Sequence, residues 1–240
     1  MSGHSKWSTI KRKKGAKDAK RGAIFSRLSK DITLAARDGG GDIDMNAALR
    51  LMVKKAKASN MPNDNIDRAI KKGTGELPGI KYESYIYEGY GPYGVALLIE
   101  VFTDNKNRTV PEIRHLLTKN NGKLGESGCV SWMFEKKGTI LINKNNLDDE
   151  TFLSDLLELG IENFEELDDE YEILIEPDDF SQAITSLENK GYDLEGDLSL
   201  IPTNTLSINQ NQLDKMIQLI EVLEEHEDVQ KVHTNIELNE

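Results

Sequence analysis

Cationic side chains crowd the N-terminal segment more densely than any other part of the chain. Eight of them face a single acid, Asp18. They are Lys6, Lys11, Arg12, Lys13, Lys14, Lys17, Lys20 and Arg21. Ammonium and guanidinium groups bind phosphates whatever the base sequence, so the segment predicts a nucleic-acid partner. The adjoining residues are small or polar apart from one indole, which can stack on an unpaired base. They are Gly3, His4, Ser5, Lys6 and Trp7.

A solvated, frayed terminus is the other interpretation of this charge, and the helical pattern that follows argues against it. Ile24, Leu28, Ile32 and Ala35 recur at helical spacing and form an apolar stripe. Followed toward the N-terminus at the same spacing, the stripe continues as Arg21, Lys17 and Lys14. One helix face is thus apolar in one half and cationic in the other, which suits a groove or an RNA surface better than a packing contact.

Charge is sorted by position along the whole chain. Residues 1–73 hold 18 Lys and Arg against 7 Asp and Glu, residues 74–138 hold 8 against 8, and residues 139–240 hold 4 against 27. The net charge of −12 therefore hides a basic N-terminal third. Such asymmetry predicts a polyanion partner for one end of the chain and a different role for the other.

A second, weaker group of cations surrounds a predicted helix in the middle of the chain. It consists of Lys106, Arg108, Arg114, Lys119 and Lys123, with Asp104 and Glu112 opposing them. Arg108 and Arg114 are candidate phosphate ligands. An ordinary solvated helix face explains the group equally well.

Two glycine-containing motifs resemble enzyme sites only superficially. Residues 89–94 match the G-x-G-x-x-G pattern, but a strand follows where nucleotide binding needs a helix, so a hairpin turn is predicted. Residues 125–129 look like a nucleophile elbow, but the fifth residue is Cys129 instead of Gly, and no His or acid is placed to complete a triad. Cys129 is therefore predicted to be a small buried residue of a strand.

The remaining polar residues form no catalytic or metal-binding pattern. The four histidines are scattered without the spacing of zinc ligands. Dense acids at 148–150, 165–170 and 176–179 fall at turns and helix starts, where carboxylates cap; an acidic docking face or a divalent-ion surface is the alternative. We expect no enzyme activity, no metal, no cofactor and no small-molecule substrate.

Composition predicts a cytoplasmic protein. The single cysteine cannot form an internal disulfide, which fits a reducing compartment. The longest apolar stretch, residues 94–102, is too short to span a bilayer, and no apolar segment of a secretory signal follows the basic N-terminus. We therefore expect no membrane partner.

The elements that position these residues begin with three helices. The first ends at glycines 39–41, the second runs from after Asp44 to near Asn60, and the third is capped by Asn63 and ends at Gly73. Next come predicted strands at 82–88 and 95–102, a helix capped by Thr109 and Glu112, and a strand at 129–134 with Trp132 in its core.

From residue 138 the order is βαββαβ, which is typical of a ferredoxin-like fold. The predicted elements are strand 139–143, helix 149–159, strands 161–167 and 171–176, helix 179–190 and strand 192–200. A strand at 205–208 and a helix at 210–225 follow, and a last strand carries Val232, Thr234, Ile236 and Leu238 inward.

The last helix and strand need a sheet, and the middle segment needs helices to cover its sheet. Joining the two gives an α+β multidomain fold: an N-terminal three-helix domain followed by two α+β (ferredoxin-like) domains, one inserted in the other. The predicted boundaries are 1–76, 77–136 plus 203–240, and 137–202.

Three long segments resemble the YebC/PmpR family. They are MSGHSKWSTIKRKKGAKDAKRGAIFSRLSKDITLAAR, NMPNDNIDRAIKKGTGE and YEGYGPYGVALLIEVFTDNKNRTVPEIRHLLTKNNGKLGESGCVSWMF. The resemblance covers essentially the whole chain. It implies a helical domain with two α+β domains, in cytoplasmic bacterial regulators that bind DNA. It also implies nucleic-acid contacts at Gly3, His4, Ser5, Lys6, Trp7, Lys11, Lys13 and Lys17.

Two functions of different classes stay open, with an unrecognised enzyme as a third. The resemblance favours a DNA-binding transcriptional regulator. The same family includes the mitochondrial translational activator of cytochrome c oxidase subunit I, and bacterial members are linked to stalled ribosomes. A ribosome-associated translation factor that binds rRNA or tRNA is therefore the alternative. No helix-turn-helix spacing is evident, and a flexible tail with one indole suits irregular RNA.

Overall fold

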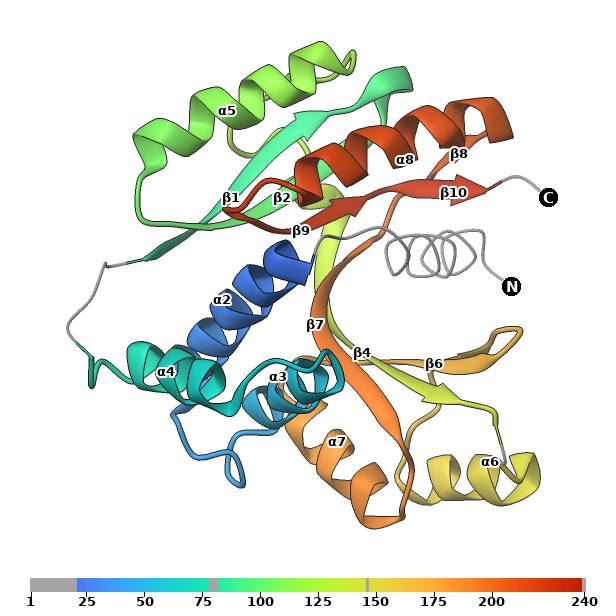
Figure 1. Cartoon of the computed structure of the whole chain (residues 1–240). Coiled ribbons are helices and arrows are strands. Elements are labelled where there is room, and N and C mark those ends of the chain that lie inside the picture. The colour runs from blue at the N-terminus through green and yellow to red at the C-terminus, as the bar shows by residue number, and fades with distance from the viewer. Residues whose placement is uncertain (1–20, 78–81, 146, 239–240) are drawn as a thin grey trace.

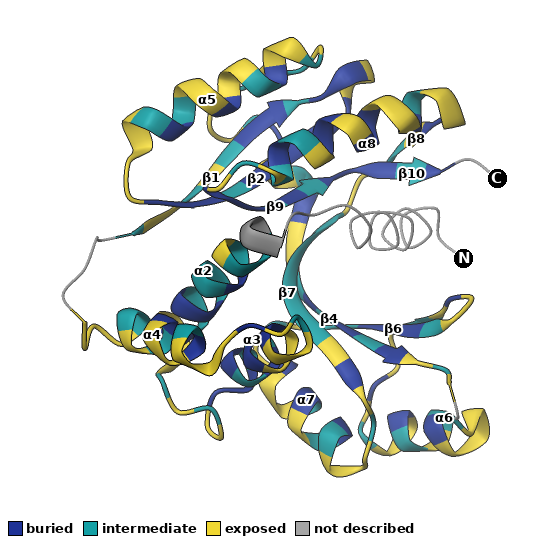
Figure 2. Cartoon of the chain, viewed as in Figure 1, coloured by how far each residue is buried: buried dark blue, intermediate teal, exposed yellow. Residues whose placement is uncertain are grey.

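The computed structural model describes residues 21–77, 82–145 and 147–238, and it has the predicted fold class (Figure 1). In these residues, three helices are followed by two four-stranded sheets, and two further strands pair with each other. Helices cover one face of each large sheet, and the buried residues lie along the strands and the facing sides of the helices (Figure 2).

The N-terminal unit consists of α2 (Arg21–Gly39), α3 (Ala47–Ala58) and α4 (Asn63–Gly73). The apolar stripe of α2 meets those of α3 and α4 in one core, which includes Leu28, Ile32, Leu49, Val53 and Ile66. As predicted, α2 ends at the glycines, and Gly40 takes the left-handed φ of +85° that ends a helix. Asn46 then caps α3, because its side-chain oxygen accepts the backbone N–H of Leu49 at 3.0 Å.

The middle unit joins segments that are far apart in the sequence. Its sheet has the order β3-β1-β2-β9, and α5 and α8 cover one face. The elements are β1 (Glu83–Tyr90), the turn η1 (Pro92–Gly94), β2 (Ala96–Thr103), α5 (Lys106–Lys119), β3 (Lys123–Leu124), α8 (Gln210–Glu224) and β9 (Val229–Thr234). In the antiparallel pair of β2 and β9, Ile99 lies opposite Val232. The C-terminal segment thus supplies the helix and the strand that the middle segment lacks.

The acidic unit inserted between these segments has the ferredoxin-like topology. Its elements are β4 (Phe134–Asn143), α6 (Asp149–Glu158), β5 (Phe164–Glu166), β6 (Glu170–Ile175), α7 (Phe180–Asn189) and β7 (Leu194–Pro202). The sheet order β5-β6-β4-β7 places the first and third strands at the centre, as the βαββαβ order requires. The exact domain boundaries stay a prediction, since Ala47 and Leu51 of α3 also pack into the core of this unit.

The predicted last strand is in fact two strands. Val232, Thr234 and Ile236 are buried as expected, but Asn235 is buried as well and β9 ends at Thr234. The strand that follows, β10 (Ile236–Leu238), pairs in parallel with β8 (Leu206–Ile208). Asn235 lies between them, and its side-chain oxygen accepts the backbone N–H of Ala96 at 2.8 Å. A side chain therefore takes the place of the next backbone hydrogen bond.

The predicted start of α5 was wrong. Asn105 is the cap, because its side-chain oxygen accepts the backbone N–H of Arg108 at 3.2 Å, and the helix begins at Lys106. Thr109 is instead a fully buried residue inside the helix, and its hydroxyl donates to Asp228 at 2.7 Å. A Thr and a Glu at capping-box spacing were therefore misleading, because a better cap precedes them.

The predicted strand at 129–134 was also wrong. Residues 131–133 form a 3-10 helix, η2 (Ser131–Met133), and β4 begins at Phe134. The carboxylate of Glu88 causes this, since it accepts the backbone N–H groups of Gly128, Val130 and Ser131 at 2.6, 2.8 and 2.9 Å. Cys129 is consequently a partly buried turn residue, and Trp132, predicted to lie in a strand core, exposes 64% of its surface.

Candidate nucleic-acid interface

Most of the predicted site residues lie outside the described part of the chain. These are Gly3, His4, Ser5, Lys6, Trp7, Lys11, Arg12, Lys13, Lys14, Lys17 and Lys20. Arg21 is the first residue of α2, and its side chain is not described. Arg108 and Arg114 are placed, and their surroundings differ.

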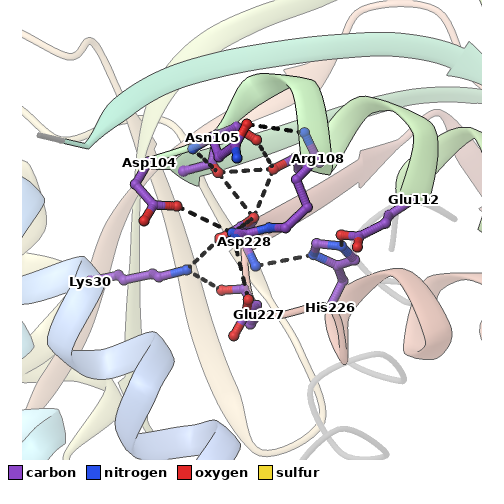
Figure 3. A network of polar contacts seen from close by, with 10 residues as sticks. Lys30, Asp104, Asn105, Arg108, Glu112, His226, Glu227 and Asp228 are labelled. Carbon is purple, nitrogen blue, oxygen red and sulfur yellow. Dashed lines mark hydrogen bonds and ion pairs between the residues drawn. The ribbon is translucent and has the colours of Figure 1, made fainter. Parts of the chain in front are cut away.

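The helix that follows the basic segment is anchored to the middle unit by its own cations (Figure 3). The Nζ of Lys30 lies 3.0 Å from Oδ1 of Asp228 and also donates to the backbone carbonyl of Glu227. One turn earlier, Arg27 donates to the backbone carbonyl of Glu224, the last residue of α8. Cations at the carbonyl end of a helix are stabilised by its dipole, so α2 is fixed at the end of α8.

Asp228 is the centre of this network and exposes only 2% of its surface. Its Oδ2 accepts the hydroxyls of Thr103 and Thr109 at 3.0 and 2.7 Å, and Arg108 at 2.7 Å. Burial alone would raise the pKa of Asp228, but hydrogen bonds from Arg108, Thr109 and Lys30 outweigh it and hold the pKa well below the usual range. The carboxylate therefore stays charged and joins α2, α5 and the turn before β9.

Arg108 is committed to this network and is not a free cation. Its Nη2 lies 2.7 Å from Asp228, 3.3 Å from Asp104 and 3.6 Å from Glu227 (Figure 3). A phosphate would have to compete with these carboxylates. Arg114, by contrast, is exposed on α5 and forms no ion pair within the described ranges, so it remains the better candidate of the two.

Four further cations that were not singled out from the sequence are exposed on α3 and α4. They are Lys55, Lys57, Arg68 and Lys71. None of the four forms an ion pair with a residue that the structure places. The spacing of Lys54, Lys55 and Lys57 on a helix with an apolar stripe was the available indication, but the denser segment before Arg21 drew attention away from it.

Beyond residue 138 the few cations are all engaged. Lys144 pairs with Glu166 at 2.7 Å, and Lys190 lies 2.9 Å from Asp155 and 2.6 Å from Glu158. Lys231 pairs with Asp197, and Lys215 lies over the ring of Tyr93. In the described residues, the cations without an ion partner therefore lie in the helical unit, on α5, in β3, at the start of β4 and, in the case of Lys215, on α8.

A second charged joint holds α2 against the other two units. Asp31 of α2 is partly buried opposite Lys231 of β9, which pairs with Asp197 of β7 and donates to the backbone carbonyl of Leu198 at 3.1 Å. Burial and the charge of Asp197 raise the pKa of Asp31 to about 6, although Lys231 lowers it. Keeping Asp31 ionised in the joint therefore lowers the stability of the folded protein.

Two features of common enzyme sites are missing from the described residues. They contain no cluster of three His, Cys, Asp or Glu side chains that could hold a metal ion. Burial and the neighbouring Glu88 raise the pKa of the Cys129 thiol, the opposite of what a nucleophile needs. Residues 89–94 form the predicted turn between β1 and β2. Among the helices that can be described, none is long and apolar enough to cross a membrane.

Comparison with known families matches nearly the whole chain. A family model described as "TACO1/YebC protein N-terminal domain" matches residues 5–76, and one described as "TACO1/YebC second and third domain" matches residues 82–236. The gap between the two models, residues 77–81, follows directly on the boundary predicted after residue 76.

Individual relatives agree. A "probable transcriptional regulatory protein" of Desulfotalea psychrophila is 52% identical over 242 residues, covering 100% of this chain and 97% of the relative. One of the same description from Natranaerobius thermophilus is 50% identical over 244 residues, covering 100% and 98%. The crystal structure of a conserved hypothetical protein from Aquifex aeolicus has a TM-score of 0.82 and 42% identity, covering 93% of each chain.

Proposed function

Because the chain belongs to the TACO1/YebC family, we propose that it is a non-enzymatic regulator that binds nucleic acid in the cytoplasm, with DNA at regulated genes as its target. Relatives at about half identity are named probable transcriptional regulatory proteins, which supports the regulatory role. In this proposal the basic N-terminal segment supplies most of the binding energy.

The distribution of unpaired cations is the observation that carries the proposal. In the described residues, exposed cations without ion partners lie on α3, α4, α5, β3 and the start of β4, and Lys215 on α8 is the one beyond residue 138; Lys144, Lys190 and Lys231 are bound by carboxylates. A phosphate backbone can bind only cations that are not already neutralised. The unpaired cations of the described residues therefore lie mainly between residues 55 and 136, and Lys215 is the exception.

The connection between α3 and α4 gives limited support to DNA. Four residues join the two helices, and Asn60 among them takes a left-handed φ of +59°. A helix-turn-helix has a connection of this length, which the sequence did not reveal. However, α4 exposes Asp64 and Asp67 in its first two turns, and carboxylates there would repel the phosphates that flank a major groove.

A ribosome-associated translation factor that binds rRNA or tRNA is the second candidate. A mixed rather than uniformly cationic α4, together with Trp7 in the basic segment, suits irregular RNA better than a regular groove. Sedimentation of fresh lysate before and after nuclease treatment separates the two candidates. A DNA-binding regulator should sediment with DNA and be released when the DNA is digested. A ribosome-associated factor should sediment with ribosomes.

The main test is the salt dependence of binding. Replacing Lys11, Arg12, Lys13 and Lys14 by Ala should weaken binding to duplex DNA and reduce the slope of log K against log salt by roughly 3 to 4, since each phosphate contact contributes about 0.9. An unchanged slope would contradict the proposal for this segment.

A matched variant of equal charge tests the location of the interface. Replacing Lys55, Lys57, Arg68 and Lys71 by Ala also removes four positive charges, but from α3 and α4. A smaller loss than in the first variant is expected. If this variant shows the greater loss of slope, the helical unit and not the basic segment holds the nucleic acid.

A further inference from the structure

We propose that Trp132, Tyr90 and Lys123 form a binding site for an unpaired nucleotide, in which the base stacks on Trp132 and Lys123 binds its phosphate. This inference rests on the proposed function and deepens it, because it assigns a contact outside the basic segment and a preference for single strands. The three side chains come from η2, β1 and β3.

Trp132 is held in an exposed position by its own turn. It exposes 64% of its surface, yet its Nε1 donates to the backbone carbonyl of Cys129 at 3.3 Å. The polar atom of the indole therefore has a partner within the protein, and most of the exposed surface is hydrocarbon ring. Exposing a Trp to water is unfavourable, so a ring displayed in this way is a candidate contact surface.

The turn that carries Trp132 is held by hydrogen bonds to a buried carboxylate. Glu88, only 7% exposed, accepts three backbone N–H groups of residues 128–131. Gly128 takes a φ of +86°, and the N–H of Met133 closes the turn on the carbonyl of Val130 at 2.9 Å. A stacking surface that is ordered before binding loses little conformational entropy when a base binds.

Tyr90 and Lys123 extend the site next to the indole. The hydroxyl of Tyr90 donates to the same Cys129 carbonyl at 3.1 Å, so the two aromatic side chains meet at one oxygen atom. Tyr90 and Lys123 lie opposite each other in neighbouring strands, and the ammonium lies 5.4 Å from the centre of the Tyr90 ring. Lys123 is exposed, and no carboxylate pairs with it among the described residues.

This combination of groups favours a nucleotide over the other occupants. Single-strand binding proteins join exposed aromatic rings to cations that follow the backbone, and every base has a face that can stack. In duplex DNA the bases are covered by their neighbours, so the indole could not reach a face without unstacking the helix. An apolar peptide would cover the ring but would leave Lys123 without an anionic partner.

The test measures binding to an unstructured RNA of about twelve nucleotides and to a duplex DNA of the same length. In the Trp7→Phe background Trp132 is the sole tryptophan, and its fluorescence should be quenched by the RNA but not by the duplex. Trp132→Ala should weaken RNA binding about 5- to 150-fold, the range expected for one stacked base, and leave duplex binding unchanged. Trp132→Phe should retain part of the affinity, and Leu157→Ala, which removes an exposed apolar side chain from the acidic unit, should retain all of it.

The outcomes separate this inference from the proposed function. Unchanged RNA affinity and unquenched fluorescence in a wild type that still binds would overturn the stacking site and leave the proposed function intact. Equal loss for RNA and duplex, or self-association that Trp132→Ala abolishes, would also overturn it. A wild type that binds neither ligand would overturn the proposed function and the site together. Thermal melting checks folding, and Trp132→Ala should melt near the wild type because the side chain is exposed.

Discussion

At the scale of single residues, Glu88 shapes the turn that displays Trp132. Burial opposes its ionisation, but hydrogen bonds from the N–H groups of Gly128, Val130 and Ser131 outweigh burial and lower the pKa of Glu88. Since the folded pKa is depressed, this carboxylate stabilises the protein above the pKa of the unfolded chain. That contribution is lost as the pH falls through the lowered folded value.

Glu88→Gln tests this role. An amide keeps the shape of the side chain but turns an N–H toward backbone N–H groups, which should lower the free energy of unfolding by about 1 to 3 kcal/mol at neutral pH. The difference from wild type should shrink at about pH 3, below the pKa of about 4.3 of an unfolded Glu, because the unfolded chain is then largely protonated and the stabilisation by the charged form is being lost. Urea denaturation at both pH values measures it, and Glu126→Gln, exposed in the same segment, should have no effect. Equal loss at both pH values would mean that the shape of the side chain, and not its charge, holds the turn.

The chemistry of several single residues was not predictable from their neighbours in sequence. Trp132 lies between Val130 and Phe134 at alternate positions, which is a valid strand pattern, and only Glu88, more than forty positions earlier, changes it to a turn. Arg108 looked free for the same reason, because its main partner Asp228 is 120 residues away. Local patterns report propensity, whereas long-range polar contacts decide the outcome.

At the scale of secondary-structure elements, α2 is joined to the rest of the molecule by charge as well as by packing. Lys30 and Arg27 contact the end of α8, and Asp31 faces Lys231 and Asp197 at the junction with β9 and β7. Lys55 and Arg27 also act on Asp31. These contacts fix the orientation of the helix into which the basic segment leads.

The raised pKa of Asp31 gives this joint a pH dependence. The folded protein binds the proton more tightly than the unfolded chain, in which an Asp has a pKa near 4. Stability contributed by this group is therefore greatest below about pH 4, falls as the pH rises to about 6, and stays low above that. Asp31→Asn removes the penalty, so it should stabilise the protein by about 1 to 2 kcal/mol at pH 7.5 and progressively less between pH 6 and pH 4.

Thermal unfolding of Asp31→Asn across this pH range is the measurement. Asp38→Asn, on an exposed part of the same helix, should behave like the wild type at every pH. If Asp31→Asn is less stable than the wild type at pH 7.5, then attraction to Lys231 outweighs burial and the carboxylate holds the joint together.

Helices and strands were largely predictable, and their ends were not. The stripe of α2, its glycine end and the βαββαβ order all followed from periodicity and turn residues. The errors arose where two local rules competed, as with Asn105 and Thr109 at the start of α5, or where a side chain replaced a backbone partner, as at Asn235. The sorting of charge required no structure, but the distinction between free and paired cations did.

At the scale of the whole molecule, basic and acidic regions are folded together rather than tethered. Ala47 and Leu51 of α3 lie in the core of the acidic unit, and Arg50 pairs with Glu188 at 2.8 Å. The ring of Phe180 and the side chain of Ile184 also approach Gly196 next to Leu51. Deleting residues 138–202 would therefore expose apolar surface of the helical unit and is a poor test of what the acids do.

Neutralising exposed acids in place is the better test of their effect on binding. Glu150, Glu162, Asp168 and Asp178 are exposed on the acidic unit, and each can be changed to its amide, which moves the net charge from −12 to −8. Long-range repulsion of phosphates should then weaken, so affinity for duplex DNA should rise roughly two- to tenfold at low salt and return to the wild-type value at about 1 M, where charges are screened within about 3 Å.

The opposite change, Gln182→Glu with Asn189→Glu on α7, adds two negative charges and should lower affinity at low salt by a smaller factor. Filter binding across a salt series measures both variants, with circular dichroism as the check on folding. If the four amides weaken binding in a folded protein, the acidic unit takes part in contact, for example through a bridging cation, and does not merely repel the nucleic acid.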